Sequence, residues 1–186
     1  NLSENENMKK TFRLLRYDWP LHFVLLFTNW LPDNTPCLAM RGWLAHFFFG
    51  SCGKNLRLGR NVVFYNPCKI HLGSHIYAAY GCWFMGGAEI MIDDDAIFGP
   101  YCVIVSSNHQ NGQGSFRYGI PKVAPIRVGT GSWVGAHVTI TAGAGVGAGC
   151  LVAAGAVVTG KTYRPRHLVG GVPAREIRPL QNEPEI

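Results

Sequence analysis

The 186-residue chain is long enough for one domain with a substantial core, and 15% of its residues are charged against 47% hydrophobic ones. This balance excludes a disordered chain, and no apolar run reaches the roughly 18 residues that would predict a membrane span. The formal net charge of +6 favours an anionic partner, which a phosphorylated small molecule, a nucleic acid or an anionic membrane surface would each provide.

Residues 1–55 are predicted to form a helical cap on the N-terminal end of the core. Their most apolar stretch, "LHFVLLFTNWL" at 21–31, lies between Pro20 and Pro32. Basic residues precede it as in a signal peptide, but no small-residue cleavage site follows. These basic residues are Lys9, Lys10, Arg13 and Arg16. We expect a helix packed on the core, and the alternative is a peripheral contact of this N-terminal helix with a membrane surface.

β-branched residues recur at every sixth position in the C-terminal half of the chain. They are Val128, Val134, Ile140, Val146, Val152 and Val158. A second small or aliphatic set follows each of the first five by four positions: Ser132, Val138, Ala144, Cys150 and Ala156. This period is neither helical nor simply alternating, and it is typical of a parallel β-helix with three short strands per coil. Since the period continues upstream to Leu58 with two-residue slips, we predict an all-β solenoid over residues 56–163.

Four of the six cysteines fall on the second inward position of the repeat: Cys68, Cys82, Cys102 and Cys150. At such positions a free cysteine acts as a small core hydrophobe. The chain has no CxxC pair, so we expect free thiols rather than a disulfide framework. Free thiols indicate a reducing compartment, and we expect a cytoplasmic protein.

Residues 106–124 interrupt the repeat with a polar loop that begins "SSNHQNGQG", and the coils resume at "PIRVG". Insertions in a solenoid map to one face and often carry function. His109 lies where the loop leaves the rigid coil, a position that aims a side chain better than a loop tip does. The alternative is a histidine that only hydrogen-bonds the loop base. Beyond the repeat, we expect the tail at 164–186 to cover the last coil.

Motifs in a fixed order link the chain to a known family: "SNHQ" at 107–110, "PIRVGTGSWVGAHVTI" at 125–140, "VAAGAVVTGK" at 152–161 and "GGVPAREI" at 170–177. Together they resemble the left-handed β-helix acyltransferases, above all sugar O-acetyltransferases of the maltose and galactoside type and of exopolysaccharide gene clusters. The resemblance covers residues 56–178. It implies a left-handed parallel β-helix that moves an acetyl group from acetyl-CoA to a hydroxyl of a sugar or polysaccharide precursor, by direct attack. It also implies a homotrimer with active sites between subunits.

The resemblance also implies roles for individual residues. His109 matches the family's general base, a role that suits a side chain with a pKa near neutrality. The backbone N–H of Ala136 matches the donor that stabilises the oxyanion. The matches along the coenzyme A groove, the last three of them to its phosphates, are Trp133, Ala136, Ala154, Thr159, Lys161, Arg175 and Arg178. An aromatic at a subunit interface and a solvated basic tail are the alternatives for Trp133 and for the basic residues.

The acceptor site departs from the family pattern. Maltose and galactoside enzymes carry an asparagine thirty residues before the histidine, where this chain has Ala79. The expected substrate contacts are Ala79, Tyr80, Trp83, Asn108 and Tyr118. The aromatic rings among them suit stacking on a pyranose face, or alternatively packing against a neighbouring subunit.

Other functions fit the sequence less well. A γ-type carbonic anhydrase would need zinc ligands five residues apart, and no histidine pair has that spacing. We expect no metal, and we interpret Asp93, Asp94 and Asp95 as turn residues. Nucleic-acid binding rests on net charge alone, so we expect none. A non-catalytic scaffold leaves the histidine loop unexplained, and an amino-sugar N-acetyltransferase or an antibiotic acetyltransferase would use the same base and groove.

Overall fold

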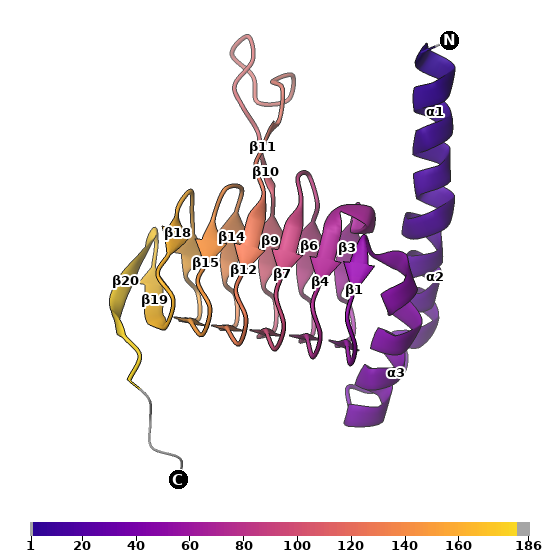
Figure 1. The fold of residues 1–186 in the computed structure, drawn as a ribbon. Helices are drawn as coiled ribbons and strands as arrows, with labels where there is room; N and C mark the ends of the chain where they lie inside the picture. The colour runs from indigo at the N-terminus through magenta and orange to yellow at the C-terminus, as the bar shows by residue number, and fades with distance from the viewer. Residues whose placement is uncertain (1, 182–186) are drawn as a thin grey trace.

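The computed structural model describes residues 2–181 and their side chains from Met8 onward. The chain forms a parallel β-helix with a group of helices at its N-terminal end (Figure 1). Each coil contributes one short strand to each of three sheets, here named A, B and C. Sheet A contains β1 (Ser51–Cys52), β4 (Ile70–Leu72), β7 (Ile90–Ile92), β12 (Ile126–Val128), β15 (Gly145–Val146) and β18 (Thr162–Tyr163). Sheet B contains β2 (Arg57–Leu58), β5 (Tyr77–Ala78), β8 (Ile97–Phe98), β13 (Trp133–Val134), β16 (Leu151–Val152), β19 (His167–Gly171) and β20 (Ala174–Pro179). Sheet C contains β3 (Val63–Tyr65), β6 (Trp83–Met85), β9 (Val103–Val105), β14 (Thr139–Thr141) and β17 (Val157–Val158).

The six-residue period marks the inward column of side chains, and its prediction is confirmed. All six residues of the series from Val128 to Val158 are at most 3% exposed. The two-residue slips upstream also have a structural cause. In β4, both Ile70 and Leu72 are buried while His71 points outward, so one strand supplies two inward residues and the coil lengthens without changing the alternation. These residues pair in register with Ile90 and Ile92 of the next coil.

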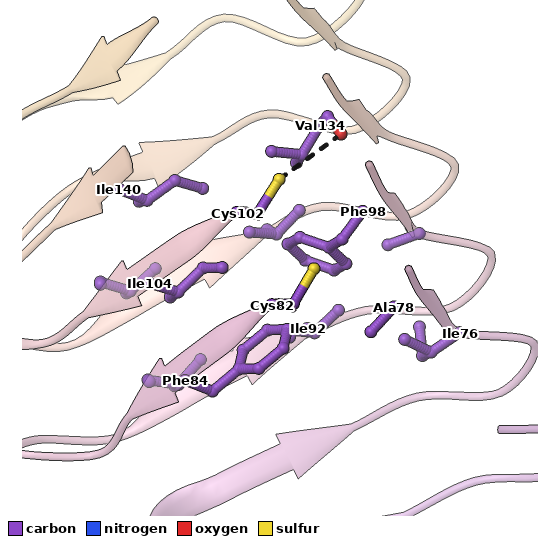
Figure 2. Packing of buried hydrophobic residues seen from close by; sticks show 14 of the residues in the cluster. Ile76, Ala78, Cys82, Phe84, Ile92, Phe98, Cys102, Ile104, Val134 and Ile140 are labelled. Carbon is purple, nitrogen blue, oxygen red and sulfur yellow. Dashed lines mark hydrogen bonds between the residues drawn. The ribbon is translucent and has the colours of Figure 1, made fainter. Parts of the chain in front are cut away.

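Thiols fill part of the core, as Figure 2 shows for Cys82 and Cys102 among aliphatic and aromatic side chains. Both are fully buried, and their S–H groups donate to the carbonyls of Gly99 (3.1 Å) and Gly135 (3.0 Å). All six cysteines are free. The neighbouring Cys82 thiol, and then burial, raise the pKa of Cys102, so this thiol stays neutral. The inward position predicted for Cys68 is wrong: a 3₁₀ turn, η3 (Pro67–Lys69), leaves that side chain half-buried.

The helices form a layer over the first coil (Figure 1). α1 (Leu2–Arg13) continues through a π-helical turn, η1 (Leu14–Asp18), into α2 (Trp19–Thr28). α3 (Thr35–Ala45) follows, capped by the Asn34 side chain, which accepts from the Cys37 N–H (3.0 Å), and it ends in a 3₁₀ turn, η2 (His46–Phe48). α3 approaches the coil so closely that a Cβ on Gly42 would lie 1.8 Å from the carbonyl oxygen of Leu56. No helix among the described residues is both long and apolar enough to cross a membrane.

One buried cation joins the helices to the β-helix. The Arg41 side chain is fully buried, and its guanidinium donates to the backbone carbonyls of Thr28, Leu31 and Leu58. It also donates to the Asp33 carboxylate (3.3 Å). Because these partners belong to α2, the following loop and β2, Arg41 fixes the orientation of the helical layer on the first coil.

At the other end, an antiparallel hairpin closes the last coil. β20 pairs with β19 at the edge of sheet B, so the parallel stacking stops there. The Tyr163 hydroxyl donates to the Ala174 carbonyl (2.8 Å) from inside the last coil. Arg164, in the turn before β19, donates to the Glu176 carboxylate on β20 (2.8 Å). The sheets therefore extend from Ser51 to Pro179, beyond the stretch in which the repeat is visible in the sequence.

Candidate active site

The loop that carries His109 has a rigid root. β10 (Ser107–Asn108) and β11 (Lys122–Val123) pair antiparallel and leave the third coil at the corner between sheets C and A (Figure 1). Ser106 below them is fully buried, and its hydroxyl accepts from the Ala88 N–H (2.9 Å). Its carbonyl accepts from the Ala124 N–H (3.2 Å), which ties the two ends of the loop together. His109 directly follows β10 with an exposed side chain, so a fixed backbone presents its imidazole to solvent.

The glycines of the loop allow its two arms to touch. A Cβ on Gly119 would lie 1.7 Å from the carbonyl oxygen of Gln110, so only glycine fits where the arms cross. Gly112 and Ser115 exchange backbone hydrogen bonds at the tip. Tyr118 is 81% exposed, and Asn108 at the root is also exposed. The two loop residues predicted to contact the acceptor substrate therefore both have exposed side chains.

The predicted oxyanion donor lies in the turn between β13 and β14, at the corner between sheets B and C. Among the described residues, the N–H of Ala136 has no hydrogen-bond partner, and neither does that of Ala154 one coil later. The turns rest directly on one another, since a Cβ on Gly99 would lie 2.7 Å from the Ala136 nitrogen. Gly135 stands in the same relation to Ala154. The corner thus presents a column of unpaired amide donors.

The other predicted groove residues lie on sheet B and at the C-terminal end. Trp133 points outward from β13 and is 54% exposed, in register with Ile97 and Leu151. Thr159 is half-buried, and its carbonyl accepts from the Lys161 N–H (2.7 Å). An outward aromatic in an apolar row suits a groove wall and a subunit interface equally well.

Three basic side chains predicted to face the coenzyme phosphates are exposed in the last coils. Lys161 holds its ammonium 4.8 Å from the centre of the Tyr163 ring. Arg175 and Arg178 lie on β20, opposite Gly170 and Leu168 of β19. Arg175 and Arg178 therefore lie at the C-terminal edge of sheet B, whereas Lys161 lies at the corner between sheets C and A in the last coil.

The coil residues predicted to contact the acceptor substrate differ in how exposed their side chains are and in whether they already have partners. Ala79 is 7% exposed, so its side chain offers almost no surface. Tyr80 is held by the Asn61 side chain, which donates to its hydroxyl (2.6 Å), and by the Tyr101 ring at 5.4 Å. Trp83 on sheet C is 43% exposed.

A column of rings along the corner between sheets B and C was missed from the sequence. Tyr80 meets Tyr101 edge to face, and Tyr101 stacks on His137 with ring centres 5.1 Å apart. Tyr101 and His137 both have φ near +58°, at equivalent turns of successive coils. These rings meet because successive coils stack, and since the coils differ in length, no regular period marks the three positions in the sequence.

The structure separates the predicted catalytic groups of one chain into two sets. Asn108, His109 and Tyr118 share the loop at the corner between sheets C and A. Ala136 and Ala154 share the corner between sheets B and C. The width of sheet C lies between these corners, so a site that uses both sets requires a second copy of the chain.

Sheet A carries a network of polar side chains that the sequence analysis did not identify. The His71 ring bonds the Ser51 hydroxyl through Nδ1 (3.0 Å) and the Glu89 carboxylate through Nε2 (2.6 Å). Ser51 and His71 line an open hollow of about 430 Å³. The adjacent Gly50 N–H is engaged by the carbonyls of Pro67 and Ile70, so it is not available to an oxyanion. We assign no catalytic role to the hydrogen-bonded set of Ser51, His71 and Glu89.

The acidic run behaves as turn residues. Asp94 accepts from the Ser74 N–H (2.7 Å), and Asp95 adopts the left-handed conformation with φ +59°. Asp93 pairs with Arg127 (3.0 Å). Among the side chains that the structure describes, from Met8 to Gln181, no three His, Cys, Asp or Glu gather as a metal site would require.

Comparison with known proteins identifies relatives that are named acetyltransferases. No protein-family model matches the sequence. The galactoside O-acetyltransferase of Escherichia coli is 28% identical over 134 residues, which is 72% of this chain and 66% of that protein. The first curated relatives are matched over 55% to 66% of their own lengths.

Solved structures match over more of the chain. A maltose O-acetyltransferase from Clostridium difficile superposes with a TM-score of 0.78 at 27% identity, covering 92% of this chain and 89% of that one. A hexapeptide-repeat acetyltransferase from Vibrio cholerae, solved with acetyl-CoA, gives a TM-score of 0.73 at 26% identity, with 87% and 88% covered. In its six-residue repeat and in these likenesses, the chain is similar to acetyltransferases of the hexapeptide-repeat type.

Proposed function

We propose that the chain transfers an acetyl group from acetyl-CoA to a hydroxyl of a saccharide, with His109 as general base. The observation that carries this proposal is the likeness, over 87% of the chain, to an acetyltransferase solved with acetyl-CoA. The free side chain of His109 on its anchored root supports the assignment of the base. General-base assistance of this kind contributes about 10²–10⁴-fold in rate.

The proposed reaction has two bond changes and one proton relay. His109 accepts the hydroxyl proton while the hydroxyl oxygen bonds to the thioester carbonyl carbon. The Ala136 N–H donates to the carbonyl oxygen as that oxygen gains negative charge. When the carbon–sulfur bond breaks, the imidazolium returns its proton to the leaving sulfur. The products are an acetyl ester and coenzyme A thiol, and His109 ends neutral.

We propose a homotrimer because the two catalytic groups of one chain lie at different corners. Sheets B and C both expose apolar side chains, such as Trp133 on B and Trp83 on C. Two different apolar faces on one chain suit a head-to-tail contact, B against C, and such contacts close into rings. In this arrangement the loop of one chain lies over the groove of its neighbour.

The cofactor groove would run from the turn amides to the basic end of the β-helix. Ala136 and Ala154 supply unpaired N–H donors for the acyl and pantetheine parts, with Trp133 beside them on sheet B. Thr159 lies at the corner between sheets C and A, so in the head-to-tail trimer it would come from the neighbouring chain together with His109. Lys161, Arg175 and Arg178 supply exposed positive charge for the phosphates, and arginine's planar fork suits phosphate oxygens. Acetyl-CoA brings the activated thioester, and these residues hold it in line.

The acceptor is proposed to be a saccharide on a route to polysaccharide. Trp83 and Tyr118 are aromatic and exposed, so their faces are free to stack on a pyranose ring, and Asn108 adds an amide beside His109. Tyr80 is already engaged, so we assign it to shaping the site rather than to direct stacking. Ala79 contributes space where relatives have an asparagine. The six free thiols suit a reducing compartment, and we propose a cytoplasmic enzyme.

The test compares the same substitution at two histidines. His109→Asn removes the base, whereas His75→Asn is the control, since Asn55 occupies the equivalent turn one coil earlier. Thiol release from acetyl-CoA is measured with neutral sugars and with amino sugars. We expect sugar-dependent release that falls about 10²–10⁴-fold in His109→Asn and is unchanged in the control. Equal rates for both variants would overturn the role of His109, and release with amino sugars alone would make the enzyme an N-acetyltransferase.

A further inference from the structure

The helical layer has an aromatic outer face that nothing in the described chain covers. On α1, η1 and α2, large apolar side chains are exposed: Met8, Phe12, Leu15, Trp19, Phe23, Leu26 and Phe27. They recur from Met8 to Phe27 along the continuous helix that α1, η1 and α2 form together. In Figure 1 this helix extends past the coils on the same side as the β10–β11 loop.

This face is the back of the layer that caps the β-helix. In α2, Leu21 and Leu25 are buried against the first coil, whereas Trp19 and Phe23 are about half exposed. Residues two apart lie about 200° round a helix, so the exposed set points away from the coils. α3 and η2 repeat the pattern, because Arg41, Gly42 and Ala45 face inward while Met40, Trp43 and Phe47 are exposed. Both helices therefore present one apolar outer surface.

The charges beside this surface are positive. Lys9 and Lys10 are exposed on α1, and Arg16 is exposed next to η2. Between residues 8 and 48 the only acidic residues are Asp18 and Asp33, and both are paired with arginines of the layer. Glu4 and Glu6 precede this stretch in the sequence. An apolar face flanked by lysine and arginine is the pattern of a helix that lies in a membrane interface.

We propose that this outer face, made of α1, α2 and α3, binds the surface of an anionic lipid bilayer. A second copy of the chain is a poorer occupant, because it would bring the same lysines and arginines towards their own kind. An anionic bilayer offers both an apolar phase for the aromatic rings and phosphates for the cations. The layer would lie flat on the membrane with the solenoid axis pointing away from it. This inference does not depend on which acceptor the enzyme uses.

The experiment measures binding of the full chain to vesicles of phosphatidylcholine alone and of phosphatidylcholine with phosphatidylglycerol. We expect sedimentation with the anionic vesicles only, and a blue shift in tryptophan emission, since three of the five tryptophans (Trp19, Trp30 and Trp43) lie in the helical region. The binding should weaken as salt is raised. A failure of the native chain to bind anionic vesicles at low salt overturns the proposal.

Variants then locate the surface. Phe12→Ser with Trp19→Ser should weaken binding about tenfold or more, since each loses apolar burial in the interface. Both side chains point outward, so the melting temperature should not fall. Ile120→Ser is the control, because Ile120 is 82% exposed but lies on the loop. If the control weakens binding as much as the double variant does, the helical layer is not the surface.

Charge variants test the anionic part of the proposal. Lys9→Gln with Lys10→Gln should weaken binding about 30-fold at low salt, from ~1 kcal/mol per cation near the lipid surface. Lys122→Gln, an exposed lysine on β11 away from the helical layer, should have no effect. Sedimentation velocity of the Phe12→Ser, Trp19→Ser variant supplies the rival outcome. If the variant forms a smaller assembly than the native chain does, and neither the variant nor the native chain binds vesicles, the face contacts a second copy and the membrane proposal is overturned.

Discussion

Replacing Ala136 by proline deletes one backbone N–H and changes little else in the turn. That N–H has no partner among the described residues, so the fold loses no hydrogen bond. Proline already occupies the equivalent place one coil earlier: the Pro100 carbonyl accepts from the His137 N–H, as the Ala136 carbonyl accepts from the Gly155 N–H. The substitution therefore isolates the amide proton from the geometry around it.

The expected effect is large on the rate and small on stability. Loss of one oxyanion donor lowers kcat about 10²–10³-fold, which corresponds to ~3–4 kcal/mol. The free energy of unfolding should stay within ~1 kcal/mol of the native value, since proline at a compatible site mainly reduces the freedom of the unfolded chain. The KM for acetyl-CoA should change little, because the donor acts on charge that develops in the transition state.

The control is the same substitution at another corner. Ala148 is exposed in a turn between sheets A and B. Pro165 occupies the equivalent place one coil later: a Cβ on Gly129 would lie 2.5 Å from the Ala148 nitrogen, and a Cβ on Gly147 would lie 2.5 Å from the Pro165 nitrogen. Both variants are assayed by thiol release and by urea unfolding. A folded Ala136→Pro variant whose kcat stays within about threefold of that of Ala148→Pro would refute the assignment of this amide.

Other consequences follow from the ends of the β-helix. Arg41→Met should lower the free energy of unfolding by ~3–5 kcal/mol in urea titration, because it leaves buried carbonyls and the Asp33 carboxylate without their donor. A loss below ~1 kcal/mol would contradict the role of Arg41 as the link to the helices. The hydrogen bond from Arg164 lowers the pKa of Glu176 to about 2, so this pair stabilises the fold above the ordinary carboxyl range and its contribution is lost as pH falls from about 4.5 towards 2. Glu176→Gln should therefore remove that part of the acid destabilisation in melts between pH 7 and pH 2, and an unchanged pH profile would count against it. Arg175→Gln should raise the KM for acetyl-CoA several-fold at constant kcat, and a fall in kcat alone would argue against a phosphate contact.

Much of the β-helix could be predicted because its core obeys a short local rule. Each coil must place a small or β-branched residue inward at fixed spacing, so the column from Val128 to Val158 is visible in the sequence. Cys82, Cys102 and Cys150 occupy the second column for the same reason. Cys68 does not, since a 3₁₀ turn replaces the regular corner there, and no periodic signal announces such a turn.

Contacts between distant segments could not be predicted. Arg41 bonds carbonyls of three segments that only the folded chain brings together, and its position in an apolar helix gives no sign of them. The pairing of His71 with Glu89 depends on coils twenty residues long stacking in register. For the candidate site, the order of motifs indicated the residues. The resemblance also implied active sites between subunits, but which residues lie at which corner followed only from the strand order of the sheets.

The central claim is that each active site takes His109 from one chain and the Ala136 amide from its neighbour. The most direct test mixes two inactive variants, His109→Asn and Ala136→Pro, unfolds them together and refolds them as one sample. With random assembly, about a quarter of the sites receive both native groups, so acetyl transfer should recover to about a quarter of the native rate. Each variant refolded alone should stay inactive. If the mixture, shown by differently tagged chains to have exchanged subunits, also stays inactive, the two groups do not meet across a subunit interface and the account is wrong.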